Sequence, residues 1–143
     1  MGRRARRVAH ITGQEQRDEA LESASTGAPP SFTPKMKLWI VLADHVQFGY
    51  GRAQLLRAIE ERGSIRKAAA HFGMSYRRVW GYLQELEAAA GFPLLERRVG
   101  GWGHGGATLT PEGRAFLTQY EAWQAHVESI VRQSFATYFP TRI

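Results

Sequence analysis

The sequence of 143 residues predicts a mainly α-helical protein with a small β component. Three observations favour this class. Apolar residues recur at helical spacing between Arg52 and Ala90, and glycines and serines divide that stretch into short helices. A long segment after Thr110 has the same spacing. Short alternating runs before and between these helices predict two β-hairpins.

The composition limits the class of partner. The chain has 19 basic and 13 acidic residues and a net charge of +6, and arginine supplies 16 of the basic residues. Because guanidinium groups match phosphate oxygens, this bias favours a polyanion. The absence of cysteine excludes disulfides and thiolate chemistry. The longest apolar run, 38–43, is too short for a membrane span, so we expect a cytoplasmic protein without a membrane partner.

The chain is expected to contain three segments. Residues 1–34 are arginine-rich, then acidic, then rich in Ser and Pro, with few large apolar residues, so we predict a disordered basic tail. Residues 35–110 are expected to form the folded domain, and residues 111–139 a long helix. The alternation from Met36 to Leu42 predicts a strand, and Val46–Phe48 a short return strand.

Glycines and serines delimit three short helices. The first is predicted over Arg52–Arg62, with Gly63 as its stop. Ser64 would cap a second helix over Ile65–Phe72, and Gly73 would supply the left-handed turn. Ser75 would cap a third helix over Tyr76–Ala90, closed by Gly91. Two helices joined by such a turn indicate a helix-turn-helix.

A glycine-rich hairpin is predicted directly after the third helix. Pro93–Val99 and Ala107–Leu109 suit two strands, and the intervening 100–106 holds five glycines in seven residues. No phosphate-binding glycine motif opens a helix here, which argues against a nucleotide loop. The hairpin therefore predicts a wing, and the whole arrangement is a winged helix-turn-helix with an N-terminal β-hairpin.

The last helix is predicted to begin at Pro111, capped by Thr110, and to continue to about Tyr138. Its apolar residues follow a 4-3-4-3 spacing typical of a coiled-coil seam. We therefore expect a dimerisation helix, with packing on the chain's own core as the alternative. The seam residues are Phe116, Tyr120, Trp123, Val127 and Ile130.

The third helix carries the candidate chemistry. At 100° per residue, Val79, Leu83, Leu86 and Ala90 share an inward face, while Arg77, Gly81 and Gln84 point outward. Arginine can bond bidentately to guanine and glutamine to adenine, and a glycine between them lets the backbone approach closely. This face suits the major groove of DNA.

Charge agrees with that geometry, because the stretch from Arg62 to Gln84 holds five basic residues and no acidic one. Tyr76 and Trp80 lie on flanks and could either contact DNA or pack. Arg97 and Arg98 alternate, so one is expected to reach phosphate. Trp102 and His104 could contact the backbone or remain an exposed loop. The candidate DNA contacts are Ser64, Arg66, Lys67, Ser75, Tyr76, Arg77, Arg78, Trp80, Gly81, Gln84, Arg97, Arg98, Trp102 and His104.

No enzyme site is predicted. The five histidines are scattered without a metal-ligand spacing, and Ser64 and Ser75 are better explained as helix caps than as nucleophiles. We expect no catalytic residue, no metal and no cofactor.

The segment Met74–Trp80, together with the glycine pattern of 100–106 and Leu109-Thr110, resembles the N-terminal DNA-binding domain of the ModE family of molybdenum-dependent transcriptional regulators. Gly63-Ser64-Ile65 and Ala68-Ala69 belong to the same pattern, and the chain is more distantly similar to LysR-type domains. The resemblance implies a homodimeric regulator bound to a palindromic operator. Trp102 and His104 depart from the family's usual wing residues.

Full-length ModE proteins carry molybdate-binding domains after the long helix, whereas this chain ends at Ile143. We therefore expect no molybdate site in this chain. The alternative function is a protein-interaction module or anti-regulator that uses the same fold without DNA. The acid-free basic stretch argues against it, because a protein-binding face does not require one.

Overall fold

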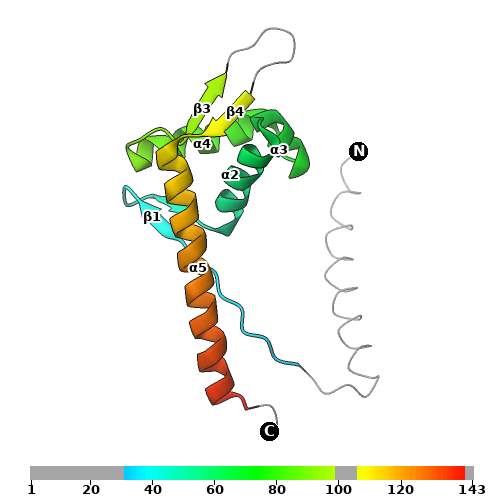
Figure 1. Cartoon of the computed structure of the whole chain (residues 1–143), viewed down its shortest axis with the longest axis vertical. Helices are drawn as coiled ribbons and strands as arrows, with labels where there is room; N and C mark the ends of the chain where they lie inside the picture. Colours follow the sequence, from blue (N-terminus) through cyan, green and yellow to red (C-terminus); the bar gives the residue numbers. More distant parts are fainter. Residues whose placement is uncertain (1–30, 99–105, 141–143) are drawn as a thin grey trace, which may run out of the picture. The chain divides into compact units, whose positions relative to one another are not determined.

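The computed structural model describes residues 31–98 and 106–140. Most of the predicted tail and the tip of the glycine-rich hairpin, including Trp102 and His104, lie outside the described residues. Pro34–Ile143 form one compact unit. Its elements are β1 (Ile40–Leu42), β2 (Val46–Phe48), α2 (Tyr50–Arg62), α3 (Ile65–His71), α4 (Tyr76–Ala90), β3 (Leu95–Arg98), β4 (Gly106–Leu109) and α5 (Pro111–Tyr138). The predicted class, mainly α with two small hairpins, is confirmed (Figure 1).

The first hairpin is shorter than its sequence suggests. β1 pairs antiparallel with β2, with Ile40 opposite Phe48 and Leu42 opposite Val46. The predicted strand from Met36 is wrong before Ile40, because β2 has only three residues and leaves the earlier segment without a partner in the ladder. Ala43 adopts a positive φ of 48° in the turn that joins the two strands.

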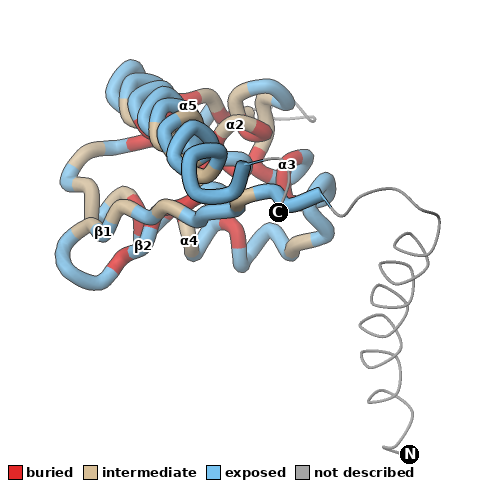
Figure 2. Tube along the Cα trace, turned by 90° about the horizontal axis from the view of Figure 1, so that it is seen from below, coloured by how far each residue is buried: buried red, intermediate tan, exposed pale blue. Residues whose placement is uncertain are grey.

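Three helices and the two hairpins surround one core. Leu56 and Ile59 of α2, Ala68 of α3 and Leu83 of α4 are all fully buried or nearly so. These buried positions on α2, α3 and α4 belong to the predicted apolar stripes, and Figure 2 marks the buried segments of the chain in red. α2 begins at Tyr50, before the predicted start at Arg52, because Gly51 keeps its backbone N–H and C=O and costs the helix only conformational entropy.

The helix-turn-helix forms as its caps predict. Ser64 Oγ accepts a hydrogen bond from Lys67 N at 3.2 Å, and Ser75 Oγ accepts one from Arg78 N at 3.1 Å. Gly73 has a φ of 63°, and Met74 N donates to Ala69 O at 2.9 Å across the turn. These local hydrogen bonds therefore fix where α3 ends and where α4 begins.

The second hairpin lies against the turn between α2 and α3. β3 pairs antiparallel with β4, and Leu95 lies opposite Leu109. Ala107 N donates to Gly63 O at 2.9 Å, and a side chain on Gly106 would approach that same oxygen within 2.8 Å. Glycine at 106 is therefore required for the hairpin to lie against the turn between α2 and α3.

α5 is only partly covered by the domain. Its buried residues are Gly113, Leu117 and Tyr120, all in its first third. Thr110 caps the helix by accepting from Gly113 N at 2.9 Å, and Pro111 occupies the first turn as predicted. At 1.5 Å per residue, the eighteen residues after Tyr120 extend about 27 Å past the core (Figure 1).

Two predicted seam residues belong to the domain's own core. The Phe48 ring packs edge-on against Phe116 and Tyr120, at centroid distances of 4.8 and 5.0 Å. Tyr120 is 1% exposed, and its hydroxyl donates to Leu38 O at 3.0 Å. Burial raises the pKa of Tyr120, with a further contribution from the charge of Glu128. The prediction that Tyr120 contacts a second chain is wrong, and Phe116 is half-buried on the same core.

Candidate nucleic-acid interface

α4 presents one face to the core and the opposite face to solvent. Val79, Leu83 and Leu86 are buried, which confirms the predicted inward face. Arg77, Gly81 and Gln84 are exposed on the opposite side. The helix ends at Gly91, which has a φ of 79°, and its N-terminal end is free of acidic residues. A single face of α4 is therefore available to a partner over more than two turns.

Gly81 leaves a bare strip of backbone in the middle of that face. A Cβ built there would meet no atom within 4 Å, and the backbone has an ordinary helical conformation. Glycine in an exposed helix interior costs about 1 kcal/mol relative to alanine. Nothing in the described part of the fold requires glycine at this position, and the bare backbone is open to a partner that approaches α4 from outside.

Positive charge surrounds this face. The five basic residues of the acid-free stretch 62–84 are all exposed, and Arg97 and Arg98 of β3 are exposed as well. The basic residues of the surface are Arg62, Arg66, Lys67, Arg77, Arg78, Arg97 and Arg98. Arg62 Nη2 also lies 2.8 Å from His71 Nδ1 at the end of α3. The surface suits a polyanion, because the basic side chains come from four elements.

Aromatic rings on one flank of α4 lie against arginines of neighbouring elements. The guanidinium of Arg66, from α3, lies 4.9 Å from the centre of the Tyr76 ring. That of Arg97, from β3, lies 5.4 Å from the Trp80 ring. Both rings remain 40% exposed. Of the two expected roles, packing against a neighbour is therefore observed for both aromatics, and their exposed edges stay accessible.

On the other flank of α4, Arg78 contacts residues that the sequence analysis did not identify. Arg78 Nε donates to the Tyr82 hydroxyl at 3.1 Å. Arg52, from α2, lies 5.0 Å from the centre of the same ring and pairs with Glu85 at 3.4 Å. The spacing of four residues between Arg78 and Tyr82 could have indicated their contact. The contact of Arg52 with Tyr82 depends on how α2 packs against α4, so the sequence near either residue does not indicate it.

Glu60 joins three elements beneath the interface. Its carboxylate accepts from Leu109 N of β4 at 2.7 Å and from Arg114 Nε of α5 at 3.0 Å. Burial alone would raise the pKa of Glu60, but the hydrogen bonds from Leu109 and Arg114 outweigh it, and the pKa lies below its usual value. The ionised carboxylate therefore holds the hairpin and α5 against α2.

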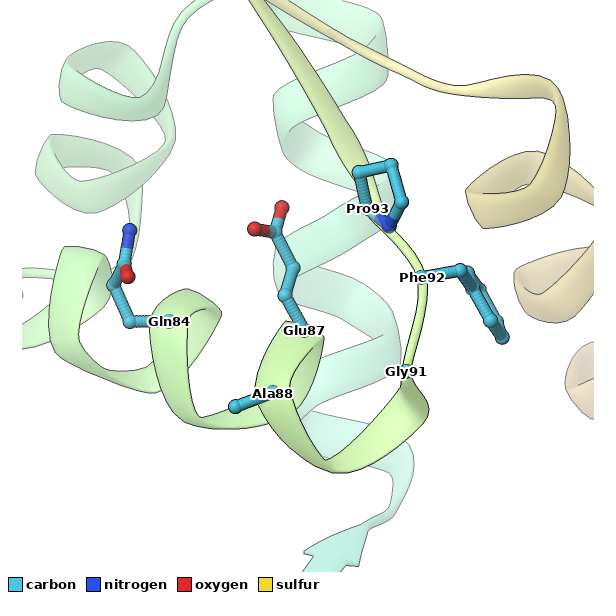
Figure 3. A pocket seen from close by; sticks show the side chains of 6 residues that line it. All are labelled: Gln84, Glu87, Ala88, Gly91, Phe92 and Pro93. Carbon is cyan, nitrogen blue, oxygen red and sulfur yellow. The ribbon is translucent and has the colours of Figure 1, made fainter.

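The far end of α4 is anchored to β3. Glu87 Oε1 accepts from both Leu94 N and Leu95 N at 3.2 Å. Figure 3 shows Glu87 at a shallow depression of about 390 Å³, whose other lining residues include Gln84, Gly91 and Phe92. Because the carboxylate already serves two backbone amides, this depression offers a ligand little polar chemistry. Glu87 instead joins the C-terminal part of α4 to the start of β3.

An exposed apolar stripe continues along α5 beyond the core. Trp123 is 41% exposed and Ile130 is 50% exposed, and Val127 lies between them on the same side of the helix. Val131 and Phe135 widen the stripe, and Phe135 stacks on Phe139 with ring centres 4.6 Å apart. The part of the predicted seam after Tyr120 is therefore open to a partner.

Among residues 31–98 and 106–140, no group of three or more His, Asp or Glu residues is arranged to hold a metal ion. No helix in the described part of the chain is long and apolar enough to cross a bilayer. Trp102, His104 and the rest of the hairpin tip lie outside the described residues.

A tri-helical core with a four-residue connection between α3 and α4, followed by a β-hairpin, defines a winged helix-turn-helix domain. Residues 51–114 match the family model of the bacterial regulatory helix-turn-helix proteins of the lysR family. This segment, which contains most of α2 and all of α3, α4 and the described strands of the hairpin, is therefore similar to LysR-type helix-turn-helix domains.

Curated relatives confirm the resemblance to ModE. The chain is 35% identical over 85 residues to the molybdenum-pterin-binding protein MopB of Rhodobacter capsulatus, which covers 59% of this chain and 32% of that protein. It is 37% identical over 70 residues to the transcriptional regulator ModE of Haemophilus influenzae, covering 49% and 28%. The chain thus spans about a third of the length of these relatives.

A solved structure gives the same class of domain. The DNA-binding domain of CbnR, crystallised with DNA, is 28% identical to this chain with a TM-score of 0.50. The match covers 62% of this chain and 97% of that domain. The similarity is therefore to a nearly complete DNA-binding domain.

Proposed function

We propose that this protein is a sequence-specific transcriptional regulator that binds double-stranded DNA and performs no chemistry. The observation that carries the proposal is the outward face of α4, where Gly81 leaves bare backbone between Arg77 and Gln84. Relatives named as ModE regulators and a similar domain crystallised with DNA support it. These relatives do not favour a protein-interaction module or anti-regulator.

In the proposed complex, α4 enters the major groove with its outward face toward the bases. Arg77 contacts guanine and Gln84 contacts adenine, each through a pair of hydrogen bonds. Ser64, Arg66, Lys67 and Ser75 lie near the N-terminal ends of α3 and α4 and contact phosphates. Phosphate contacts thus position the helix-turn-helix on the duplex, and base contacts from α4 give the sequence preference.

We further propose a homodimer that joins through α5. The stripe of Trp123, Val127 and Ile130 has the spacing of a coiled-coil seam and lies beyond the part of α5 that the core covers. A second copy with the same stripe would cover it. A two-fold axis would place two α4 helices in successive major grooves, about 34 Å apart, on a palindromic operator.

Selection of bound duplexes from a random pool, followed by sequencing, tests both proposals. We expect a palindromic motif whose half-sites are one helical turn apart. Gel shifts at two salt concentrations measure the electrostatic part of binding. A pool without enrichment at low salt would contradict the DNA-binding function, and an enriched single half-site would contradict the dimer alone.

A further inference from the structure

We infer that Tyr82 is a positioning residue, which holds the guanidinium of Arg78 ready for a phosphate of the DNA backbone beside α4. The inference rests on the proposed function, because it adds Arg78 to the phosphate contacts of the proposed DNA complex and says how that side chain is prepared. Tyr82 lies on the flank of α4 rather than on its outward face and is half-buried. It is therefore placed to act through Arg78 rather than on DNA directly.

Two contacts hold Arg78 against Tyr82. Arg78 Nε donates to the Tyr82 hydroxyl at 3.1 Å, and the guanidinium carbon lies 5.6 Å from the ring centre. The remaining donors of the guanidinium are on its two Nη atoms, which make no hydrogen bond within the described part of the chain. A guanidinium fixed through Nε can present both Nη atoms to one phosphate.

The ring of Tyr82 is itself held from α2. Arg52 lies 5.0 Å from the ring centre, and its Nη2 pairs with Glu85 at 3.4 Å. Arg52 Nη1 is buried without a hydrogen-bond acceptor in the described residues, so the electron-rich face of Tyr82 is its favourable neighbour. Glu85 offsets the charge of Arg52, which leaves Arg78 as the net positive group of this cluster.

The other arginine and aromatic pairs of the interface lack this arrangement. Arg66 with Tyr76 and Arg97 with Trp80 are ring contacts, and no hydrogen bond joins either pair in the described structure. Only Arg78, among these arginines, combines a ring contact with a hydrogen bond through Nε. Its orientation is therefore the most strongly defined before a partner binds.

Such positioning predicts a distinctive binding phenotype. An arginine that is ordered before association loses less side-chain freedom on binding, so removing the tether should weaken affinity about twofold to tenfold. The charge of Arg78 remains when the tether is lost. The slope of affinity against salt concentration should therefore be unchanged, whereas loss of Arg78 itself should lower that slope by about one.

The experiment compares Tyr82→Phe, Arg78→Ala and the double variant for binding to a mixed-sequence duplex across a salt series. A phosphate contact does not depend on sequence, so no operator is needed. Tyr50→Phe is the matched control, because the Tyr50 hydroxyl also accepts from a side chain four residues away, Gln54 Nε2, on an exposed helix surface. The order parameter of the Arg78 Nε–H group, measured by NMR without DNA, reports the tether directly.

We expect Tyr82→Phe to weaken binding at unchanged salt slope, to lower the Arg78 order parameter, and to have no further effect once Arg78 is alanine. Tyr50→Phe should bind as the wild type does. Wild-type affinity in Tyr82→Phe, or an equal loss with and without Arg78, would overturn the role of Tyr82 while leaving the DNA-binding function intact. A wild-type chain that ignores duplexes would overturn the proposed function as well.

Discussion

Replacement of Gly81 by alanine separates stability from DNA binding. The added methyl group meets no atom of the protein within 4 Å, and Gly81 lies in the interior of α4 with an ordinary helical backbone. Alanine loses less backbone freedom on folding than glycine does. The free energy of unfolding should therefore rise by about 0.5–1 kcal/mol, which corresponds to an increase in Tm of about 2–6 °C for a domain of this size.

The same methyl group should weaken binding to the selected operator. It projects from the middle of the outward face, between Arg77 and Gln84, and would hold the backbone of α4 away from the base edges. Weakening or losing one bidentate base contact costs about 1–3 kcal/mol, so affinity should fall roughly tenfold to a hundredfold. Thermal unfolding by circular dichroism and binding by fluorescence anisotropy measure the two effects on one sample.

Gly51→Ala provides the matched control. Gly51 is also an exposed glycine within a helix whose Cβ would meet nothing within 4 Å, but it lies in the first turn of α2. We expect it to leave DNA binding unchanged. If Gly81→Ala were stabilised and bound the operator as tightly as the wild type, α4 would not approach its partner closely at this position, and the proposed orientation would be wrong.

Other substitutions address the remaining parts of the proposal. Arg77→Ala should reduce the binding free energy at the selected site by about 1–3 kcal/mol and relax the sequence preference of the protein. Lys67→Ala should instead weaken binding to all duplexes alike and lower the salt slope by about one. Repeating the selection and the salt series with each variant distinguishes the two effects. Ile130→Glu should convert dimers to folded monomers in sedimentation, since Ile130 is 50% exposed and does not belong to the domain core; a stable dimer would count against the α5 interface. Because the pKa of Glu60 is lowered in the folded state, its contribution to stability is present above the unfolded value near 4.5 and is lost as the pH falls through the folded value. Glu60→Gln should lower the free energy of unfolding at neutral pH by about 1–2 kcal/mol and flatten that acid dependence, and an unaltered pH profile in chemical denaturation would remove Glu60 from this role.

Local signals in the sequence predicted α4 closely. Ser75 and Gly91 set its two ends through a side-chain cap and a left-handed residue, and both depend only on neighbours along the chain. The inward and outward faces follow from helical periodicity, so the exposure of Arg77 and Gln84 could also be predicted. DNA contact by these residues stays a prediction, because the structure contains no partner.

Features that depend on packing between distant segments were not predictable in this way. Tyr120 shares the apolar spacing of the α5 seam, but Phe48 and Leu38, more than seventy residues earlier, bury it in the core. The strand predicted from Met36 is shortened because β2 ends after three residues. The contact of Arg97 with Trp80 likewise requires β3 to lie beside α4, which the alternation of Arg97 and Arg98 cannot reveal.

The interface as a whole favours a grooved partner over a flat one. Its centre is bare backbone at Gly81, and arginines lie against aromatic rings on both flanks, Arg97 on Trp80 on one side and Arg78 on Tyr82 on the other. A flat acidic protein surface would contact the arginines on the flanks but would not reach the exposed backbone at Gly81. The major groove is about 12 Å wide, which admits a helix of 10–12 Å diameter and places a row of phosphates beside each flank. A DNA duplex with α4 in its major groove, as proposed above, would use Gly81 and the two arginines together.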